Sequence, residues 1–338
     1  MKVVLFFLCA VAVGRCVEDV VEDVEAAVDI TLTSQTTSEK LWLLGEVCSR
    51  WRGPVSLALW LNSTESTEDG VRLRMEAEAV AATQGCAPFS LTVVSQAAQE
   101  AYPVNKLRNL AIGGVATSHE LLTDMDFLPS YDLRADALAI IRARNTSRRA
   151  FVVPAFQKQG HQCQTVSDCR QLLTPLDVNV PGTFDALRNC VARKECTPFH
   201  EGVDSPGHST TDSYQWLNNT NHQTENRLRD LHCFRSKFYE PYLIVRHSES
   251  PPFDERFTGY GYNKIQHVEH LRYLGFSFQI LPKNFLVHVP HPPSASRKDF
   301  TKDARHKVYQ LHAAFIRELD NQSLKPNVTI CAKDNKKK

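Results

Sequence analysis

The sequence lacks an excess of charge of either sign. Its 338 residues include 39 Lys and Arg and 38 Asp and Glu, which gives a formal net charge of +1. A protein that binds nucleic acid through its phosphates needs a basic surface, so we expect no nucleic-acid partner. Glycine is scarce, at 14 residues, while hydrophobic residues make up 42% of the chain. These values exclude a collagen-like or disordered chain and indicate a globular protein with a sizeable core.

Long hydrophobic runs are lacking too. The N-terminal run, residues 3–14, is shorter than the roughly 20 residues that a transmembrane helix needs. Because Lys2 precedes this run and small residues lie near Arg15, we interpret residues 1–17 as a secretory signal peptide, with a signal-anchor as the alternative. We therefore expect at most an N-terminal membrane anchor. The predicted location is the secretory pathway, in the Golgi lumen or after secretion.

The Cys-x-x-Cys spacing typical of zinc sites is absent. Removal of residues 1–17 would leave eight of the ten cysteines, and an even number favours disulfides in a secretory protein. Many pairings are open to Cys48, Cys86, Cys163, Cys169, Cys190, Cys196, Cys233 and Cys331. Five N-glycosylation tripeptides fit the same compartment and mark their asparagines as surface residues. These are Asn62, Asn145, Asn218, Asn321 and Asn327.

Strands and helices are expected to alternate through the first half of the chain. Predicted strands are 29–33, 55–61, 89–94 and 119–122, and predicted helices between them are 36–51, 71–81 and 103–113. Such alternation gives right-handed crossovers and a parallel sheet. The predicted fold class is therefore α/β with a mostly parallel central sheet, stabilised by disulfides.

In the second half of the chain, predicted strands and helices alternate less regularly. Predicted strands are 150–156, 238–245 and 284–289, predicted helices are 138–144, 264–274 and 302–319, and segments 157–196 and 199–221 are expected to be irregular. We predict an acidic leader at 18–28, one folded domain at 29–320 and a basic tail at 321–338. The oligomeric state stays open, with a homodimer among the alternatives.

Asp124 and Asp126 follow the predicted strand 119–122. In open α/β sheets ligands bind outside the carboxyl ends of the strands, and two carboxylates there can bind one hard divalent cation, directly or through water. Such a cation would neutralise a diphosphate. The tripeptide alone is also common in solvated turns and helix caps, so its neighbours decide its meaning.

Two further stretches can reach the same crevice. Asn105, Arg108 and Asn109 fall at i, i+3 and i+4 of helix 103–113, so they share one face, and an arginine there suits a phosphate or a carboxylate. An ordinary amphipathic surface helix would have a similar pattern. In segment 259–264, glycines let the backbone approach a ligand and tyrosines offer faces for stacking on sugars.

Six stretches occur in the order found in glycosyltransferase family 49, and the chain resembles that family from about residue 29 to about residue 319. The family includes the C-terminal catalytic domain of the LARGE xylosyl- and glucuronyltransferases and a β-1,4-glucuronyltransferase. The stretches are YPVNKLRN (102–109), TDMDFLPSY (123–131), VPAF (153–156), YEPY (239–242), FTGYGYNK (257–264) and HVPHPPS (288–294).

The resemblance implies a GT-A (Rossmann-like) nucleotide-sugar transferase fold, a UDP-sugar donor and Mn²⁺. It further implies an inverting transfer of glucuronic acid to a glycan or glycoprotein acceptor, xylose-terminated as in matriglycan-type O-mannosyl glycans. By this resemblance Asp124 and Asp126 are the metal motif. His288 and His291 are the expected imidazole ligands, in a set that Mn²⁺ accepts.

The same resemblance suggests roles around the donor and the acceptor. Arg108 is expected to bind the donor's diphosphate or glucuronate, with Asn105 and Asn109 on its helix face, and Gln35 in turn 33–35 is expected to contact uridine. Segment 259–264 is expected to line the acceptor side. Asn263 and Lys264 stand where more distantly related galactosyltransferases have acids, so the base is open among Glu240, Asp254, Glu255 and Asp212, with Glu240 placed first.

Two alternatives remain. The chain could be the same class of enzyme with another donor, such as UDP-xylose, UDP-GlcNAc or UDP-galactose. It could also be a secreted carbohydrate-binding protein that keeps the fold without turnover. Retention of both aspartates and both histidines favours an enzyme, because a binder needs no metal ligands, whereas the missing obvious base favours the binder.

Overall fold

The computed structural model describes residues 27–95, 101–159, 163–201, 205–219, 227–292 and 301–332. The predicted signal peptide and nearly all of the predicted acidic leader lie outside the described residues. Within the described ranges, no helix combines the length and the apolar character needed to cross a bilayer.

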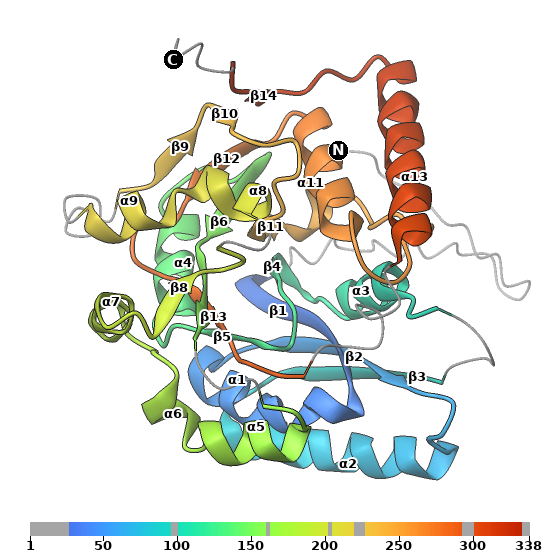
Figure 1. Ribbon diagram of the computed structural model, residues 1–338, viewed down its shortest axis with the longest axis vertical. Coiled ribbons are helices and arrows are strands. Elements are labelled where there is room, and N and C mark those ends of the chain that lie inside the picture. Colours follow the sequence, from blue (N-terminus) through green and yellow to red (C-terminus); the bar gives the residue numbers. More distant parts are fainter. Residues whose placement is uncertain are drawn as a thin grey trace, which may run out of the picture.

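An eight-stranded sheet forms the centre of the molecule (Figure 1). Its strand order is β3-β2-β1-β4-β11-β6-β12-β9; β9 and β11 run antiparallel to their neighbours, and the other strands share one direction. This confirms the predicted α/β class with a mostly parallel sheet of the GT-A (Rossmann-like) type. The strands are β1 (Ala27–Thr37), β2 (Val55–Leu61), β3 (Phe89–Ser95), β4 (Thr117–Leu122), β6 (Arg149–Val153), β9 (Arg229–Leu231), β11 (Tyr242–Arg246) and β12 (Ser277–Ile280).

Helices cover both faces of the first half of this sheet. The helices are α1 (Leu44–Trp51), α2 (Thr67–Gln84) and α3 (Val104–Ile112), and the 3-10 helix η1 (Ser38–Leu43) precedes α1. All seven residues of β2 are buried because a strand covered on both faces has no solvent side. Ala58 and Trp60 pack with residues of α3, whereas Leu57 and Leu59 belong to the larger core that includes residues of α1 and α2.

A second, four-stranded sheet adjoins the first and includes His288, one of the predicted metal ligands. Its order is β5-β13-β7-β8, formed by β5 (Phe127–Pro129), β13 (Leu286–His288), β7 (Ala155–Lys158) and β8 (Cys196–Pro198). The predicted strand 150–156 is divided between the two sheets, with Pro154 at the division. Proline has no backbone N–H for a ladder. Pro241 likewise cannot donate to a ladder, so β11 begins only at Tyr242. The predicted strand 238–245 therefore starts four residues too early.

Segments 157–196 and 199–221, which were expected to be irregular, contain short helices. The helices of the first segment are α5 (Val166–Leu173), α6 (Leu176–Asn179) and α7 (Phe184–Ala192). Those of the second are α8 (Ser205–His208), η2 (Ser209–Thr211) and α9 (Ser213–Asn218). Thr165 and Asp168 form a capping box that starts α5, a local signal that the apolar pattern did not include.

Three further helices lie near their predicted positions: α4 (Leu133–Arg142), α11 (Asn263–Tyr273) and α13 (Lys302–Asn321). Strand β12 had no predicted counterpart. Helix α4 begins five residues before its predicted start, whereas α11 and α13 each match their predicted bounds within two residues.

All eight cysteines beyond the signal segment form disulfides. The pairs are Cys48–Cys86, Cys163–Cys169, Cys190–Cys196 and Cys233–Cys331. The last pair ties Cys331, within the predicted basic tail at 321–338, to the domain, and β14 (Thr329–Ile330) pairs with β10 (Cys233–Phe234) beside it.

The disulfides differ in the length of chain that they close. Cys233–Cys331 has a sequence separation of 98, against 6 for Cys190–Cys196. In the chain-entropy model, replacing the first pair by alanines should lower the free energy of unfolding by about 4–5 kcal/mol, and replacing the second by about 2 kcal/mol. Urea unfolding of both double variants measures this. Equal losses would contradict an entropic origin.

Candidate active site and divalent-cation site

Asp124 and Asp126 lie just beyond the end of β4, beside the end of β1, where sequence reasoning placed them. The backbone N–H of Phe127 donates to the carbonyl oxygen of Asp124 at 3.0 Å, so the chain turns directly into β5. The N–H of Val289 donates to the carbonyl oxygen of Asp126 at 2.8 Å. This bond brings the end of β13, with His288, against the Asp-x-Asp segment.

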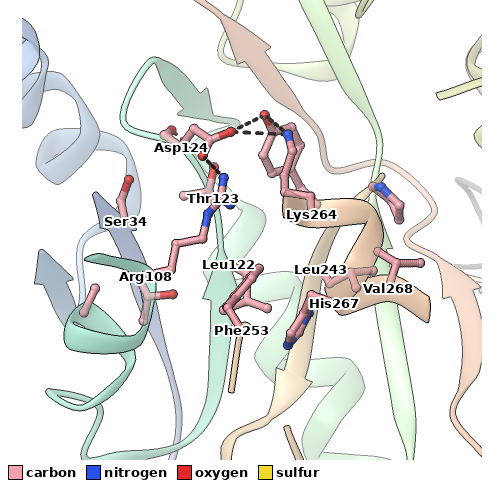
Figure 2. A pocket seen from close by; sticks show the side chains of 14 residues that line it. Ser34, Arg108, Leu122, Thr123, Asp124, Leu243, Phe253, Lys264, His267 and Val268 are labelled. Carbon is pink, nitrogen blue, oxygen red and sulfur yellow. Dashed lines mark hydrogen bonds and ion pairs between the residues drawn. The ribbon is translucent and has the colours of Figure 1, made fainter. Parts of the chain in front are cut away.

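Four side chains hold the carboxylate of Asp124, and Figure 2 labels Arg108 and Lys264 among them. Its Oδ1 accepts from Arg108 Nη2 at 2.9 Å and Gln35 Nε2 at 3.2 Å, and its Oδ2 accepts from Tyr242 Oη at 2.9 Å and Lys264 Nζ at 3.3 Å. Burial by itself would raise the pKa of Asp124, but the ammonium of Lys264 and the guanidinium of Arg108 hold it below its ordinary value. Asp124 is therefore a fixed, ionised carboxylate.

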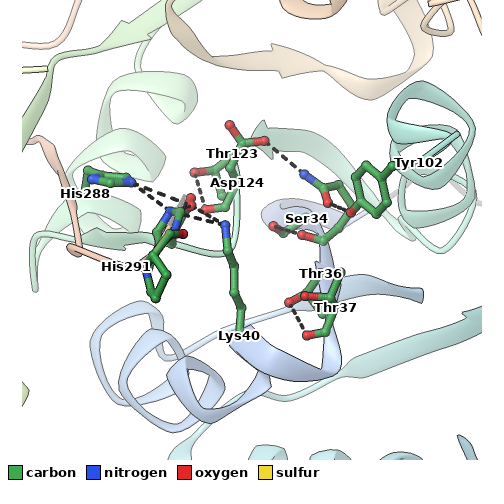
Figure 3. A network of polar contacts seen from close by, with 12 residues as sticks. Ser34, Thr36, Thr37, Lys40, Tyr102, Thr123, Asp124, His288 and His291 are labelled. Atoms are coloured by element: carbon green, nitrogen blue, oxygen red, sulfur yellow. Dashed lines mark hydrogen bonds and ion pairs between the residues drawn. The ribbon is translucent and has the colours of Figure 1, made fainter. Parts of the chain in front are cut away.

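Asp126 belongs to a different cluster, with His288 and His291. Figure 3 shows these two histidines beside Lys40. Its Oδ2 lies 2.7 Å from His291 Nε2 and 3.7 Å from His288 Nε2, and the two imidazole nitrogens are 3.2 Å apart. The ammonium of Lys40 also contacts Asp126 Oδ2, at 2.7 Å. Asp126 Oδ1 is buried and has no hydrogen-bond partner among the described residues.

These atoms fit a divalent cation. Neighbouring ligands at right angles around an ion with bonds of about 2.1 Å lie about 3 Å apart, close to the spacings found here. The Nδ1 of His291 lies 2.7 Å from the carbonyl oxygen of Pro292, which can only accept, so a neutral ring presents its lone pair at Nε2. A carboxylate oxygen and that lone pair cannot bond each other, but both can bind one cation.

The electrostatics of the cluster agree with this use. Burial alone would raise the pKa of Asp126, but the nearby ammonium of Lys40 holds it well below its ordinary value. Burial lowers the pKa of His288, although Asp126 opposes the shift. The cluster thus presents an ionised carboxylate and, at His288, a neutral imidazole, the protonation states that metal binding requires.

The predicted polar face of α3 reaches the site, but its members make different contacts. Arg108 binds Asp124, whereas Asn109 exchanges two hydrogen bonds with the backbone of Phe253, at 2.9 and 2.8 Å. Asn105 donates to the carbonyl oxygen of Asp254 at 2.8 Å and accepts from Arg108. The two asparagines therefore fix a loop beside the site, and their contact with a donor stays a prediction.

A pocket of about 420 Å³, including its part open to solvent, adjoins Asp124 (Figure 2). Ser34 at the end of β1, Arg108 from α3 and Lys264 from α11 are among the residues that line it. Cations from two helices face this pocket. Asp126, His288 and His291 are not among the residues that line this pocket, and the Asp-x-Asp segment joins the pocket at Asp124 to the cluster at Asp126.

Glu240 lies in a third group, with His200 and His208. One ligand atom from each of the three lies within 4.8 Å of the others, and a Cβ on Gly207 would come within 3.1 Å of Glu240 Oε1. Glycine at that position leaves room for the carboxylate. Burial, with Lys264 nearby, lowers the pKa of His208 well below its ordinary value, so this ring is neutral.

Aromatic rings connect this group to the cation cluster. The ring of Phe199 lies 5.1 Å from that of His208 and 5.1 Å from that of His288, and His208 stacks with Tyr242 at 6.3 Å. The other acids considered as bases have surface partners: Asp212 pairs with Arg235, Asp254 pairs with Arg256, and Glu255 accepts from Asn109.

Sequence reasoning missed several side chains of the site. Tyr242 and Lys264 belong to recognised stretches, but their contacts with Asp124 were not foreseen. Tyr102 donates to Gln35, which in turn binds Asp124 (Figure 3). Lys40 lies in a segment read only for helical spacing, and no local pattern marks it, because its partner is 86 residues away.

The comparisons with known proteins agree on a family. Residues 72–323 match the family model described as "Glycosyl-transferase for dystroglycan". The chain is 32% identical over 299 residues to the xylosyl- and glucuronyltransferase LARGE1 of Danio rerio, and 33% identical over 270 residues to LARGE2 of Rattus norvegicus. These matches cover 88% and 79% of this chain but 35% of each relative, so the chain spans only part of their length.

Solved structures show a weaker likeness. TarS of S. aureus in complex with UDP-GlcNAc has a TM-score of 0.48 at 10% identity, covering 85% of this chain and 66% of that one. GalNAc-T7 with UDP, GalNAc and Mn²⁺ has a TM-score of 0.46 at 10% identity, covering 81% and 46%. The fold assignment rests on the sheet topology instead. By the family match and by identity over most of its length, the chain belongs to the glycosyltransferase family described as "Glycosyl-transferase for dystroglycan".

Proposed function

We propose that the protein is a metal-dependent inverting glycosyltransferase that moves glucuronic acid from UDP-glucuronic acid to a xylose-terminated glycan. The observation that carries this proposal is the convergence of Asp126 Oδ2, His288 Nε2 and His291 Nε2 beside Asp124, in a member of this family. Mn²⁺ suits a mixed set of carboxylate and imidazole ligands. When bound, the ion would neutralise the diphosphate and stabilise the charge of the leaving UDP.

The donor side is proposed to lie between β1 and α3. Gln35 and the pocket residues Thr33 and Ser34 are at the end of β1, where uridine would bind. Arg108 and Lys264 bring positive charge to the same place, which suits a diphosphate and the carboxylate of a glucuronate. Since both cations also bind Asp124, a donor would share them with that carboxylate.

Glu240 is proposed as the base that removes the proton from the acceptor hydroxyl. It lies two residues before Tyr242, a partner of Asp124, and beside the neutral ring of His208. The acceptor is proposed to bind along segment 259–264, where Tyr260 is 38% exposed and Gly259 has a φ of 67° that favours glycine.

The cellular setting is a proposal of the same kind. Four disulfides and five exposed acceptor asparagines suit the secretory pathway, in the Golgi lumen or after secretion. The relatives named as LARGE transferases favour glucuronic acid as donor and a dystroglycan-type glycan as acceptor, and another UDP-sugar is the runner-up. A carbohydrate-binding relic is disfavoured because the cation cluster is complete.

Replacing Asp126 by asparagine should remove cation binding and transfer while the protein stays folded. Transfer should fall by more than about 100-fold, since even outer partners of metal ligands are worth about 10–100-fold. The melting temperature should shift by no more than about 4 °C, because the residue lies in a loop. UDP release with Mn²⁺ measures activity, and D132N, an exposed aspartate without a capping bond, is the control. Full activity of D126N would refute the cation assignment.

Replacing Glu240 by glutamine should lower kcat by about 10²–10⁴-fold, the usual contribution of general-base catalysis. Affinity for Mn²⁺ and for UDP should be unchanged, because Glu240 is not a member of the Asp126 cluster. Steady-state kinetics and calorimetric titration separate the two effects. E255Q, at an exposed acid, is the matched control. A fall in UDP affinity with unchanged kcat would assign Glu240 to binding.

A further inference from the structure

Lys40 makes the contacts that a cation in the Asp126 cluster would make. Its Nζ lies 2.7 Å from Asp126 Oδ2 and 3.3 Å from His291 Nε2 (Figure 3). An ammonium has donors only, while a carboxylate oxygen and an imidazole nitrogen that carries a lone pair are acceptors. Lys40 thus binds two of the three atoms that form the cluster.

The ammonium and a divalent cation cannot use these atoms together. Both are positive, and Asp126 is only 7% exposed, so water screens their repulsion poorly. The side chain of Lys40 is 26% exposed and has a flexible four-carbon stem, so it can leave the cluster without unfolding its helix. Cation binding therefore requires the release of Lys40.

The released ammonium would remain close to the proposed donor side. Lys40 lies in η1, which directly follows β1, and Gln35 near the end of β1 contacts Asp124. A lysine is a common point-charge ligand of phosphate. A diphosphate bound at this edge of the sheet offers the displaced ammonium a new anionic partner.

We propose that Lys40 is an internal competitor of the divalent cation, and that the diphosphate of the donor removes this competition by binding Lys40. This inference rests on the proposed function. If Lys40 acts in this way, the cation and UDP each strengthen the binding of the other. Thermodynamic linkage requires that the two affinities change by the same factor. Without nucleotide, the cation site is weakened by its own lysine.

The test is Mn²⁺ binding to the purified full chain, measured from the free-ion signal in electron paramagnetic resonance, without and with saturating UDP. Without UDP, K40M and K40Q should each bind Mn²⁺ about tenfold more tightly than the natural protein, because a charge-assisted contact no longer competes. The strengthening of Mn²⁺ binding by UDP should shrink by a similar factor. K40R keeps the charge and should show neither effect, and K106M, at an exposed lysine, is the matched control.

K40M and K40Q are used together so that misfolding of one variant does not decide the result. D126N separates the role of Lys40 from the proposed function. Unchanged or weaker Mn²⁺ binding in K40M and K40Q, with unchanged coupling to UDP, would overturn the role of Lys40 while leaving the cation site intact. D126N should abolish Mn²⁺ binding in every background. If D126N bound Mn²⁺ as the natural protein does, the cation site itself would be wrong, and both proposals would fall.

Discussion

Two neighbouring carboxylates determine the arrangement of the rest of the site. The side chains of Asp124 and Asp126 are only 19% and 9% exposed, and a charge shielded from water is tolerated only when partners compensate it. Asp124 is paired with Arg108 and Lys264, and its two oxygens accept four hydrogen bonds. Asp126 instead has one buried oxygen with no donor in the described part of the chain, and another shared among a lysine and two histidines. The first carboxylate is satisfied by the protein, and the second is the one suited to an added cation.

The scaffold brings these partners together from distant parts of the chain. Pairing of β13 with β5 sets His288 opposite Phe127, the residue after Asp126, so the antiparallel register itself places an imidazole at the metal motif. Helices α3 and α11 supply the cations for Asp124, and the 3-10 helix after β1 supplies Lys40. The positive charges that compensate the two aspartates therefore come together only in the folded protein.

Sequence patterns predicted the features that are local. Strand-like patterns located β2 and β3, helical spacing located α3 and α13, and the Asp-x-Asp segment was placed correctly after β4. The contacts of Lys40 and Tyr242 with the aspartates could not be predicted, because their partners lie 86 and 118 residues away. Prolines within apparent strands were also underweighted: Pro154 divides a predicted strand between two sheets because it cannot donate to a ladder. The family resemblance, and not the spacing, pointed to His288 and His291, which the structure brings to Asp126.

We infer that this edge of the sheet uses a divalent cation to activate a UDP-sugar. To test this, the purified protein is incubated with a panel of UDP-sugars and a xylose-terminated acceptor, and UDP release is followed with Mn²⁺ and with a chelator. We expect more release from UDP-glucuronic acid than from the other donors, and loss of this release with the chelator. Equal release with the chelator, or no response to any UDP-sugar, would show that the inference is wrong.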